Sequence, residues 1–163
     1  MIGTAARLGE GRVFASHYQI VLRDGPDAFF DEPTENWTEE SHKRGFAGNP
    51  RFRMFSTEAD LNDHWVELVL RETPVDPRDW HKTLTFDFHC ETGTVQVAGI
   101  LDTDAVITAR MAAGPYTVQA CSMNPGVDQF SLNEMGPSET LSDETLKRRR
   151  DLEWHRIHLV PAR

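Results

Sequence analysis

The amino-acid sequence predicts an all-β protein, an antiparallel β-sandwich of about eight or nine strands with one short helix near the C-terminus. Apolar and polar residues alternate with a period of two along much of the chain, as they do in half-buried strands. Clusters of Gly, Pro and Asn interrupt this alternation where turns are expected. The 163 residues favour a single β-sandwich domain, residues 1–163, with a flexible stretch at residues 1–11.

Three strands are expected in the first half of the chain. The first covers residues 12–23, and Gly25-Pro26 ends its alternation. The second covers residues 51–56. The third covers residues 61–72, whose Trp and Val residues favour a strand although the apolar spacing also fits a helix.

The second half is expected to form pairs of strands joined by tight turns. Glu91-Thr92-Gly93 has the composition of a hairpin-type turn between the first two strands, and the next two form a second pair. A polar insertion at residues 133–152 is expected to hold a short helix at 143–151, capped by Ser142. The six expected strands are residues 83–90, 94–99, 104–111, 115–123, 128–132 and 154–160.

Residues 24–50, here called the acidic segment, combine negative charge with aromatic rings. Seven carboxylates and no Lys or Arg lie between Asp24 and Glu40. Such a run stays solvated unless a partner supplies positive charge, and aromatic side chains often anchor interfaces. The alternative is a solvated loop whose Phe and Trp side chains pack onto the edge of the domain. The candidate partner-binding residues are Asp24, Asp27, Phe29, Phe30, Asp31, Glu32, Glu35, Trp37, Glu39 and Glu40.

The overall charge and the apolar runs exclude several classes of protein. The formal net charge is −9, whereas proteins that bind nucleic acid by neutralising phosphates carry an excess of Lys and Arg. We therefore expect no direct nucleic-acid binding. The first residues lack the apolar core of a signal peptide, and no run approaches the roughly 20 apolar residues of a membrane span. A cytoplasmic protein without membrane contact is expected.

The cysteines and histidines do not predict a metal site or another cofactor. Cys90 and Cys121 both fall in apolar, strand-like runs and are expected to be free, buried thiols. His155 and His158 are three residues apart on an expected strand, so they face opposite sides of the sheet and chelate poorly. The sequence contains neither a CxxC nor an HExxH motif.

No catalytic residues are predicted, and the chain is not expected to be an enzyme. Ser16 and His17 are neighbours on an expected strand, so their side chains should point to opposite faces and not bond to each other. A GxSxG nucleophile elbow is also missing from the sequence.

Three other interpretations remain open. Asp87 could form a pair of carboxylates with Glu67 or Glu91 at the separation that glycosidases use. A carbohydrate or other small ligand could stack on a Trp side chain, with Trp37 and Trp80 as candidates. The basic cluster at residues 147–150 is interpreted as the C-terminal turn of a solvated helix, and a contact with the acidic segment, within one chain or in a dimer, is the alternative.

Short motifs in a fixed order resemble one known family. They are Ser16-His17-Tyr18-Gln19, then Trp37-Thr38 inside the acidic segment, Arg44-Gly45-Phe46-Ala47, and Gly114-Pro115-Tyr116-Thr117-Val118 before a strand that ends in Asn124. In this order the motifs resemble the competence protein J family over residues 12–132.

The resemblance implies a β-sandwich inhibitor, because the family's named member inhibits a DNA-entry nuclease. A basic protein partner, such as a nuclease, agrees with the charge of the acidic segment. Nucleases are basic where they hold DNA, and an acidic inhibitor can be steered to that surface and compete there with phosphate.

Overall fold

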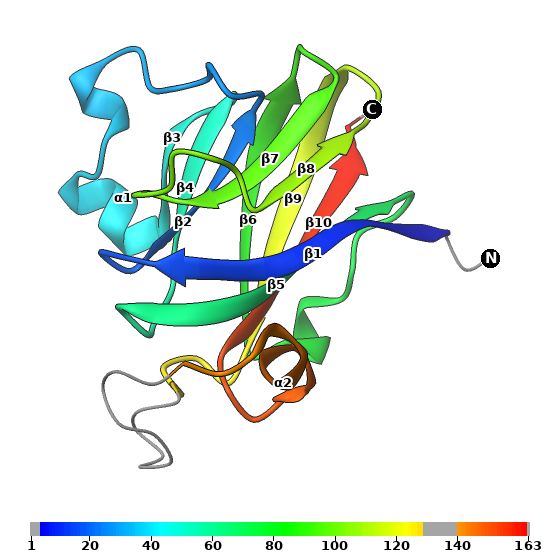
Figure 1. Cartoon of the computed structure of the whole chain (residues 1–163). Coiled ribbons are helices and arrows are strands. Elements are labelled where there is room, and N and C mark those ends of the chain that lie inside the picture. Colours follow the sequence, from blue (N-terminus) through cyan, green and yellow to red (C-terminus); the bar gives the residue numbers. More distant parts are fainter. Residues whose placement is uncertain (1–3, 129–139, 163) are drawn as a thin grey trace.

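The computed structural model describes residues 4–128 and 140–162, which form ten strands in two five-stranded sheets (Figure 1). The mostly β, two-sheet architecture is thus confirmed, with ten strands in place of eight or nine. Sheet A has the order β1 (Ala5–Ala15), β5 (Asn62–Arg71), β10 (Trp154–Pro161), β9 (Gly114–Met123) and β6 (Lys82–Cys90). Sheet B has the order β3 (Phe46–Asn49), β4 (Phe52–Ser56), β2 (Gln19–Asp24), β7 (Thr94–Gly99) and β8 (Ile107–Arg110).

The two sheets share one apolar core. Its buried side chains come from alternate positions of strands in both sheets, as the period of two requires. Phe55 and Val97 of sheet B belong to the same cluster as Phe86, Val118 and Ile157 of sheet A. Burying apolar side chains against both sheets is the main force that holds the two layers together.

Short helices lie outside the two sheets. The expected helix near the C-terminus is present as α2 (Asp143–Arg148), and the Ser142 side chain caps it by accepting a bond from the Thr145 amide. A second helix, α1 (Glu39–Arg44), lies in the acidic segment and was not expected. Two 3₁₀ turns, η1 (Pro33–Glu35) and η2 (Pro77–Asp79), complete the set within the described residues. Among these residues no helix is long or apolar enough to cross a membrane.

The first expected strand is in fact two strands that belong to different sheets. β1 ends at Ala15 and β2 begins at Gln19, and the chain reverses through His17 and Tyr18. Both turn residues have positive φ angles, 57° and 58°, as in the two-residue turns of hairpins. The prediction was wrong here because the usual Asn-Gly signal is missing. β1 also begins at Ala5, so residues 5–11, expected to be flexible, pair with β5.

The two expected hairpins of the second half are also wrong. β6 pairs with β9 and β7 pairs with β2 and β8, so the turn at Glu91–Gly93 carries the chain from sheet A to sheet B. The link from β8 to β9 carries the chain back to sheet A. Period-two alternation identifies a strand but not the sheet that it joins. The strand expected at residues 128–132 falls almost entirely outside the described residues.

The C-terminal strand lies near the centre of sheet A. β10 pairs with β9 in the antiparallel sense and with β5 in the parallel sense, whereas the other described pairs are antiparallel. The parallel pair brings residues near position 65 beside residues near position 155. This contact between distant parts of the sequence places His64 near His155.

The prediction of two free, buried thiols is confirmed. Cys90 and Cys121 are both buried and unpaired. They lie at opposite ends of the β6–β9 pair, where Cys90 is opposite Gly114 and Cys121 is opposite Thr83. Burial raises the pKa of the Cys121 thiol to about 11, so this thiol is protonated at neutral pH.

Asp24 is a structural residue at the end of β2 and not part of the exposed acidic surface. Its side chain is 1% exposed and accepts bonds from Arg51 Nε at 2.7 Å, from the amides of Glu91 and Thr92 at 3.0 Å, and from Thr92 Oγ1 at 2.7 Å. Burial raises the pKa of this carboxyl, but these bonds outweigh burial and hold the pKa at about 2. Its expected role in partner binding is therefore corrected, because all its contacts are internal.

Replacing Asp24 should destabilise the fold. Asp24→Asn removes the charge and places an amide group where the side chain now only accepts bonds, at an expected cost of about 2 kcal/mol of unfolding free energy. The stabilisation by the carboxylate is complete above its unfolded pKa of 3.8 and is lost as the pH falls to about 2. Urea unfolding at pH 7 and at pH 2 measures both effects.

The matched control is Asp27→Asn, since Asp27 is an exposed acid three residues away. It should change the unfolding free energy by less than about 0.5 kcal/mol. Equal effects of the two substitutions at pH 7 would show that the buried bonds of Asp24 do not stabilise the fold.

Candidate functional site

The acidic segment packs on the outer face of sheet B through its aromatic rings, and the exposed ring of Phe29 lies 5.0 Å from the Phe52 ring. Phe30 and Trp37 are half-buried, and the indole Nε1 of Trp37 donates to Gln19 Oε1 at 2.8 Å. The Trp37 ring also stacks on His42, with ring centroids 5.0 Å apart. Phe30 and Trp37 attach the segment to the sheet, which agrees with the interpretation that Phe and Trp side chains of this segment pack onto the domain. The residues beneath them are Val21, Ala47, Phe52 and Met54.

Glu35 fastens the middle of the segment from within. Its Oε2 accepts bonds from Asn49 Nδ2 at 3.0 Å, from the Asp31 amide at 2.6 Å and from the Glu32 amide at 3.2 Å. The bond from Asn49 is the main reason that the pKa of Glu35 lies below its usual value. Asn49 also donates to the Phe29 carbonyl at 3.1 Å. Glu35 is half-buried and serves the shape of the segment.

Local sequence fixes the helix that follows. The Thr38 side chain accepts a bond from the Ser41 amide at 3.2 Å, and Ser41 Oγ accepts one from the Thr38 amide at 2.6 Å, which together form a capping box. Glu39 and Glu40 occupy the first turn, where the helix dipole favours negative charge. Gly45 ends the helix with φ of 89°, a conformation that glycine adopts without strain.

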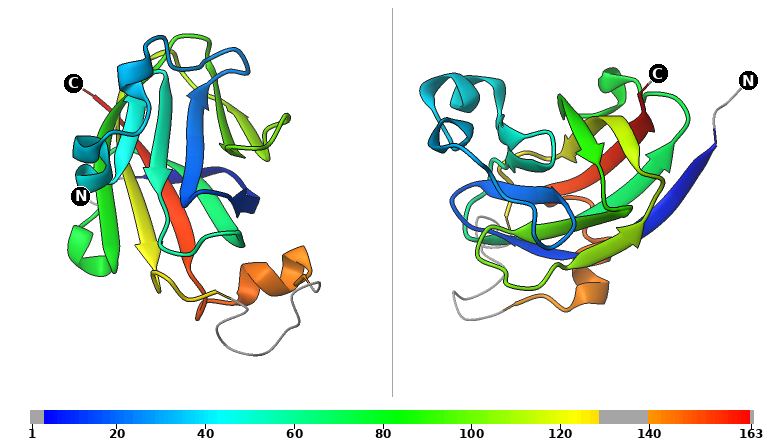
Figure 2. Two further views of the ribbon diagram at one scale, coloured as in Figure 1. Left: turned by 90° about the vertical axis from the view of Figure 1, so that its left-hand side faces the viewer. Right: turned by 90° about the horizontal axis from the view of Figure 1, so that it is seen from above.

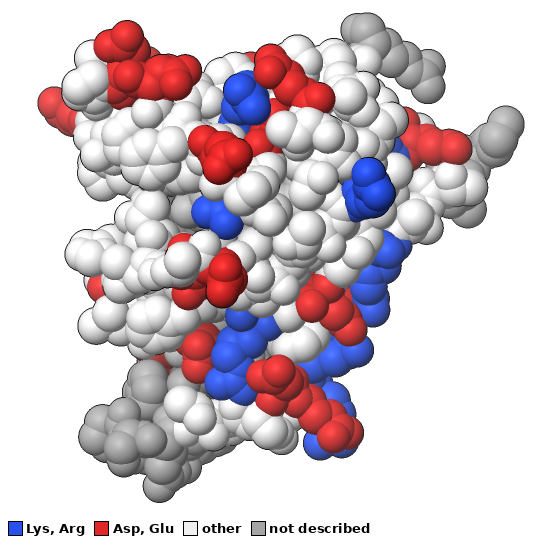
Figure 3. All heavy atoms as spheres, turned by 45° about the horizontal axis from the view of Figure 1, so that its top comes forward, with Lys and Arg blue, Asp and Glu red and all other residues white. Residues whose placement is uncertain are grey.

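The exposed carboxylates of the segment, together with Phe29, form what we call the acidic face. Its only aromatic ring, Phe29, is 56% exposed and stacks on Phe30 with 4.1 Å between ring centroids. Figure 3 shows acidic side chains gathered at the upper left, over this segment. Within the described residues, one short ion pair involves these carboxylates, Lys43–Glu39 at 3.7 Å. The acidic face consists of Asp27, Phe29, Asp31, Glu32, Glu39 and Glu40.

Comparison with known proteins identifies the family. Residues 12–135 match the family model of competence protein J, ComJ, which is more than half of the chain. The chain belongs to the competence protein J family. The resemblance inferred from the sequence motifs is confirmed, over nearly the same residues. A search of the curated proteins found no match.

Two solved structures share the fold. The first is ComJ from Bacillus subtilis, described as an inhibitor of the DNA degrading activity of NucA, with a TM-score of 0.67 and 14% sequence identity over 98% of this chain and 99% of that chain. The second is described as crocagin biosynthetic gene J, with a TM-score of 0.59 and 14% identity over 100% of each chain. At this identity the two structures show a common fold.

The motifs that carry the family resemblance have structural roles in this chain. His17 and Tyr18 make the turn between the two sheets, and Trp37 attaches the acidic segment to sheet B. Gly45 ends α1, and Gly114 begins β9. The motifs therefore build the frame that presents the acidic face.

Ser16 and His17 form the bond that the sequence argument excluded. Ser16 Oγ lies 2.9 Å from His17 Nδ1, because the two residues lie at a turn and not along one strand. His17 is exposed, whereas Ser16 is buried. The buried hydroxyl is out of reach of a substrate, so the pair has the distance but not the access of a nucleophile and its base.

The four cations of the basic cluster at residues 147–150 contact acidic residues and an aromatic ring near α2. Lys147 contacts Glu10, Arg148 lies 3.6 Å from Glu144, and Arg149 bonds to Asp151 at 2.8 Å. The guanidinium of Arg150 lies 4.0 Å from the centre of the Trp154 ring. Figures 1 and 2 place α2 at the opposite end of the molecule from α1 and the acidic segment. The alternative of a contact within one chain is therefore wrong.

Asp87 and Glu67 are too far apart to act as a pair of glycosidase carboxylates. β10 and β9 lie between β5 and β6, so three strand spacings separate the two residues, roughly 14 Å against the 9.5 Å or less that such pairs need. Glu67 is also fully buried, with ion pairs to Arg7 at 2.9 Å and Arg156 at 3.1 Å. Asp87 is paired with Arg53.

Of the two Trp candidates for ligand stacking, Trp80 borders a hollow. Trp37 is held against sheet B, as described above. Trp80 is half-buried beside Trp154, and the two hollows on the outer face of sheet A share Arg71, Arg156 and His158. The Arg156 guanidinium lies 5.4 Å from the centre of the Trp80 ring, so a cation and not a sugar occupies this position.

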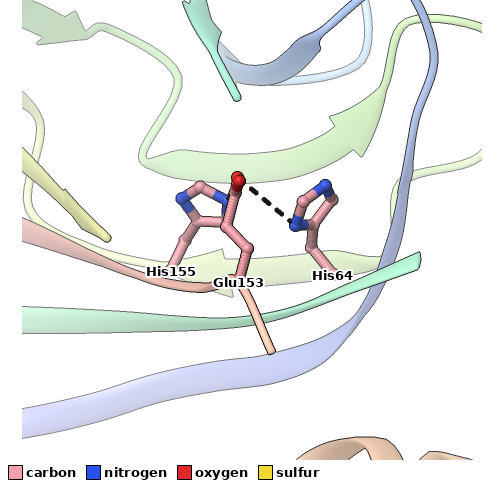
Figure 4. A group of neighbouring side chains, drawn as sticks. All are labelled: His64, Glu153 and His155. Atoms are coloured by element: carbon pink, nitrogen blue, oxygen red, sulfur yellow. Dashed lines mark ion pairs between the residues drawn. The ribbon is translucent and has the colours of Figure 1, made fainter. Parts of the chain in front are cut away.

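One group of chemically active side chains was missed by the sequence argument. His155 and His158 do lie on opposite faces, since His155 meets Phe55 inside and His158 meets Trp80 outside. His155, however, is joined by His64 and Glu153, and all three are buried (Figure 4). No local spacing reveals this group, because His64 arrives through the parallel pairing of β5 with β10.

The protonation of this group follows from its burial. Burial, with the nearby His155, lowers the pKa of His64 to about 4. Burial raises the pKa of Glu153, but the two rings and the Gly126 amide outweigh burial and hold the pKa at about 2. At neutral pH the carboxylate is therefore charged and the His64 ring is neutral.

Removing the Glu35 carboxylate should loosen the acidic segment without unfolding the protein. Glu35→Ala removes three accepted bonds, so the free energy of local opening at the Asp31 amide should fall by about 1 kcal/mol, roughly fivefold faster exchange. Amide hydrogen exchange measures this. Glu40→Ala is the matched control, because Glu40 is exposed, and it should leave exchange at Asp31 unchanged. Equal exchange in both variants would mean that Glu35 does not hold the segment.

Proposed function

We propose that this chain is a non-catalytic inhibitor that binds a DNA-degrading nuclease through the acidic face. Its membership of the competence protein J family supports this proposal, as does the description of the Bacillus subtilis relative as an inhibitor of NucA. The observation that carries the mechanism is the exposure of five carboxylates with one short ion pair among them in the described part of the chain.

Electrostatics explains how such a face would act. A nuclease must be positively charged where it holds the phosphates of DNA. The acidic face presents carboxylates that compete for that surface, and the net charge of −9 steers the two proteins together. Because exposed charges are screened by salt, the association rate should fall as ionic strength rises.

The shape of the segment supports tight binding as well as attraction. The rings of Phe30 and Trp37, the bonds of Glu35 and the capped helix α1 hold the exposed residues in place before any partner arrives. A surface that is ordered in advance loses less conformational entropy on binding. Phe29 stands out from this surface and supplies an apolar anchor that the partner would bury.

Neutralising the acidic face should weaken the complex without disturbing the fold. Binding is measured by titration calorimetry against the DNA-degrading nucleases encoded in the same genome, at low and at high salt. Four substitutions leave the structural acids Asp24 and Glu35 intact and should lower affinity about 10- to 100-fold and flatten its salt dependence. They are Asp27→Asn, Asp31→Asn, Glu32→Gln and Glu40→Gln.

A second set of four substitutions changes the net charge by the same amount at exposed sites outside the acidic segment. If both sets weaken the complex equally, total charge and not the acidic face controls binding. If neither set changes affinity or its salt dependence, the proposed mechanism is wrong. The control set is Glu72→Gln, Asp79→Asn, Asp104→Asn and Glu144→Gln.

Small-ligand binding is a second candidate function, favoured by the two hollows that share Arg71, Arg156 and His158, one of which Trp80 borders. His158 lies 2% exposed between them, and neither ring nitrogen has a hydrogen-bond partner within the described residues. Burial, together with the charges of Arg71 and Arg156, lowers the pKa of His158 to about 4. Two guanidinium groups at such a hollow favour an anionic ligand over a neutral sugar.

Thermal shift distinguishes the two functions. Citrate, glucose 6-phosphate and ATP are compared with glucose, and an anion that binds here should raise the melting temperature by about 6 °C at 100 times its dissociation constant. Arg71→Gln should abolish that rise. A chain whose melting temperature ignores all the anions, or responds equally after Arg71→Gln, does not use this hollow as a ligand site.

A further inference from the structure

Three buried side chains at one end of the core place two imidazoles around one carboxylate oxygen (Figure 4). Oε2 of Glu153 lies 3.6 Å from Nδ1 of His64 and 2.9 Å from Nε2 of His155. All three residues are at most 1% exposed. They come from the start of β5 and from the chain that enters β10, so the fold itself brings them together.

The hydrogen bonds leave a bare ring nitrogen of His64 where the three groups meet. Nε2 of His64 faces the Ala59 carbonyl at 3.4 Å, which can only accept, so the proton of this ring is on Nε2 and Nδ1 is bare. This bare nitrogen points at the charged Glu153 oxygen, an arrangement of two acceptors with no donor between them. Nε2 of His155 is within hydrogen-bond distance of the same oxygen, at 2.9 Å, whereas Nδ1 of His64 makes no hydrogen bond within the described residues. An unpaired buried acceptor is unfavourable unless a hydrogen-bond donor or a cation meets it, and no donor from the described residues meets this one.

The spacing of the three atoms fits a tetrahedral metal ion. Bonds of about 2.0–2.1 Å from zinc to nitrogen or oxygen place neighbouring ligand atoms roughly 3.4 Å apart. The observed separations of 2.9 and 3.6 Å lie on either side of this value. All three ligand atoms are within 4.8 Å of one another. Small rotations of the side chains are sufficient to reach bonding distance.

We propose that His64, Glu153 and His155 bind a divalent transition-metal ion, with zinc as the best fit. Two imidazoles with one carboxylate are a known ligand set for zinc, whereas calcium and magnesium prefer oxygen ligands alone. A water molecule takes the fourth position.

The surroundings already hold the ligands as a metal site requires. The ring nitrogen of each histidine that faces away from Glu153 has a partner: Ala59 O for His64 and Ser122 Oγ for His155, at 2.8 Å. Oε1 of Glu153 accepts from the Gly126 amide at 2.6 Å and the Ala59 amide at 3.0 Å, and Oε2, which would bind the metal, accepts from the Glu58 amide at 3.3 Å. Such outer contacts orient the ligands of metal sites.

The ion would have a structural role. No substrate reaches three side chains that are this deeply buried. The ion would instead join β5, the start of β10 and the turns that carry Ala59 and Gly126, and so stabilise this end of the core. This role is independent of the acidic face, which lies on the outer side of sheet B.

Metal binding by the whole chain tests the proposal. The purified protein is treated with a chelator, dialysed, and titrated with Co²⁺ and then Zn²⁺. One equivalent of Co²⁺ should give the intense visible absorption of a tetrahedral site, and Zn²⁺ should displace it. Zinc at about 100 times its dissociation constant should raise the melting temperature by about 6 °C, whereas Mg²⁺ should not.

Glu153→Gln removes a ligand of the proposed site, and His158→Gln, which removes a buried histidine outside the site, is the matched control. His158 is a buried histidine on the same strand that faces the opposite side of sheet A, so His158→Gln should keep the one equivalent. Glu153→Gln should lose it. The proposal is wrong if the wild type gives no tetrahedral cobalt spectrum and no zinc-dependent rise in melting temperature. It is also wrong if Glu153→Gln keeps the site. If Glu153→Gln does not fold, the cobalt spectrum and the zinc-dependent melting temperature of the wild type decide whether the proposal holds.

Discussion

The buried carboxylate of Asp24 fixes the point at which the chain leaves sheet B, and the position of the acidic face depends on it. Four bonds tie this carboxylate to Arg51 and to the turn between β6 and β7. Beyond it, Trp37 and Glu35 hold the segment to the sheet. Acidic residues in one short stretch therefore have two different tasks. Some are buried or bonded within the chain and give the segment its shape, and the rest face solvent with their charge available.

The buried group of His64, Glu153 and His155 depends on how the chain crosses between the two sheets. The turn at His17 and Tyr18 and the turn at Glu91–Gly93 each carry the chain from one sheet to the other. The parallel pair of β5 and β10 then brings His64 to His155, although 91 positions along the sequence separate them. Side chains from two distant segments, the start of β5 and the start of β10, therefore meet inside the core.

The sequence was sufficient to predict the strands and the family, because both leave local signals. Alternation located β4, β5, β6, β7, β9 and β10 within a few residues, and short motifs indicated competence protein J. Sheet membership left no such signal, so the two turns above were misread. The sequence alone also does not distinguish Asp24 from Asp27, because both are aspartates in the same acidic run. Only the three-dimensional contact with Arg51 and Thr92 separates the buried acid from the exposed one. The cluster around Glu153 was invisible for the same reason.

Amide hydrogen exchange of this chain, alone and bound to its nuclease, tests the central claim most directly. The account predicts slower exchange at residues 27–40 in the complex, with exchange along β10 and η2 unchanged, because the acidic face lies on the outer side of sheet B and those elements belong to the opposite side. Slower exchange on the outer face of sheet A, around Trp80 and Arg156, with residues 27–40 unaffected, would contradict it.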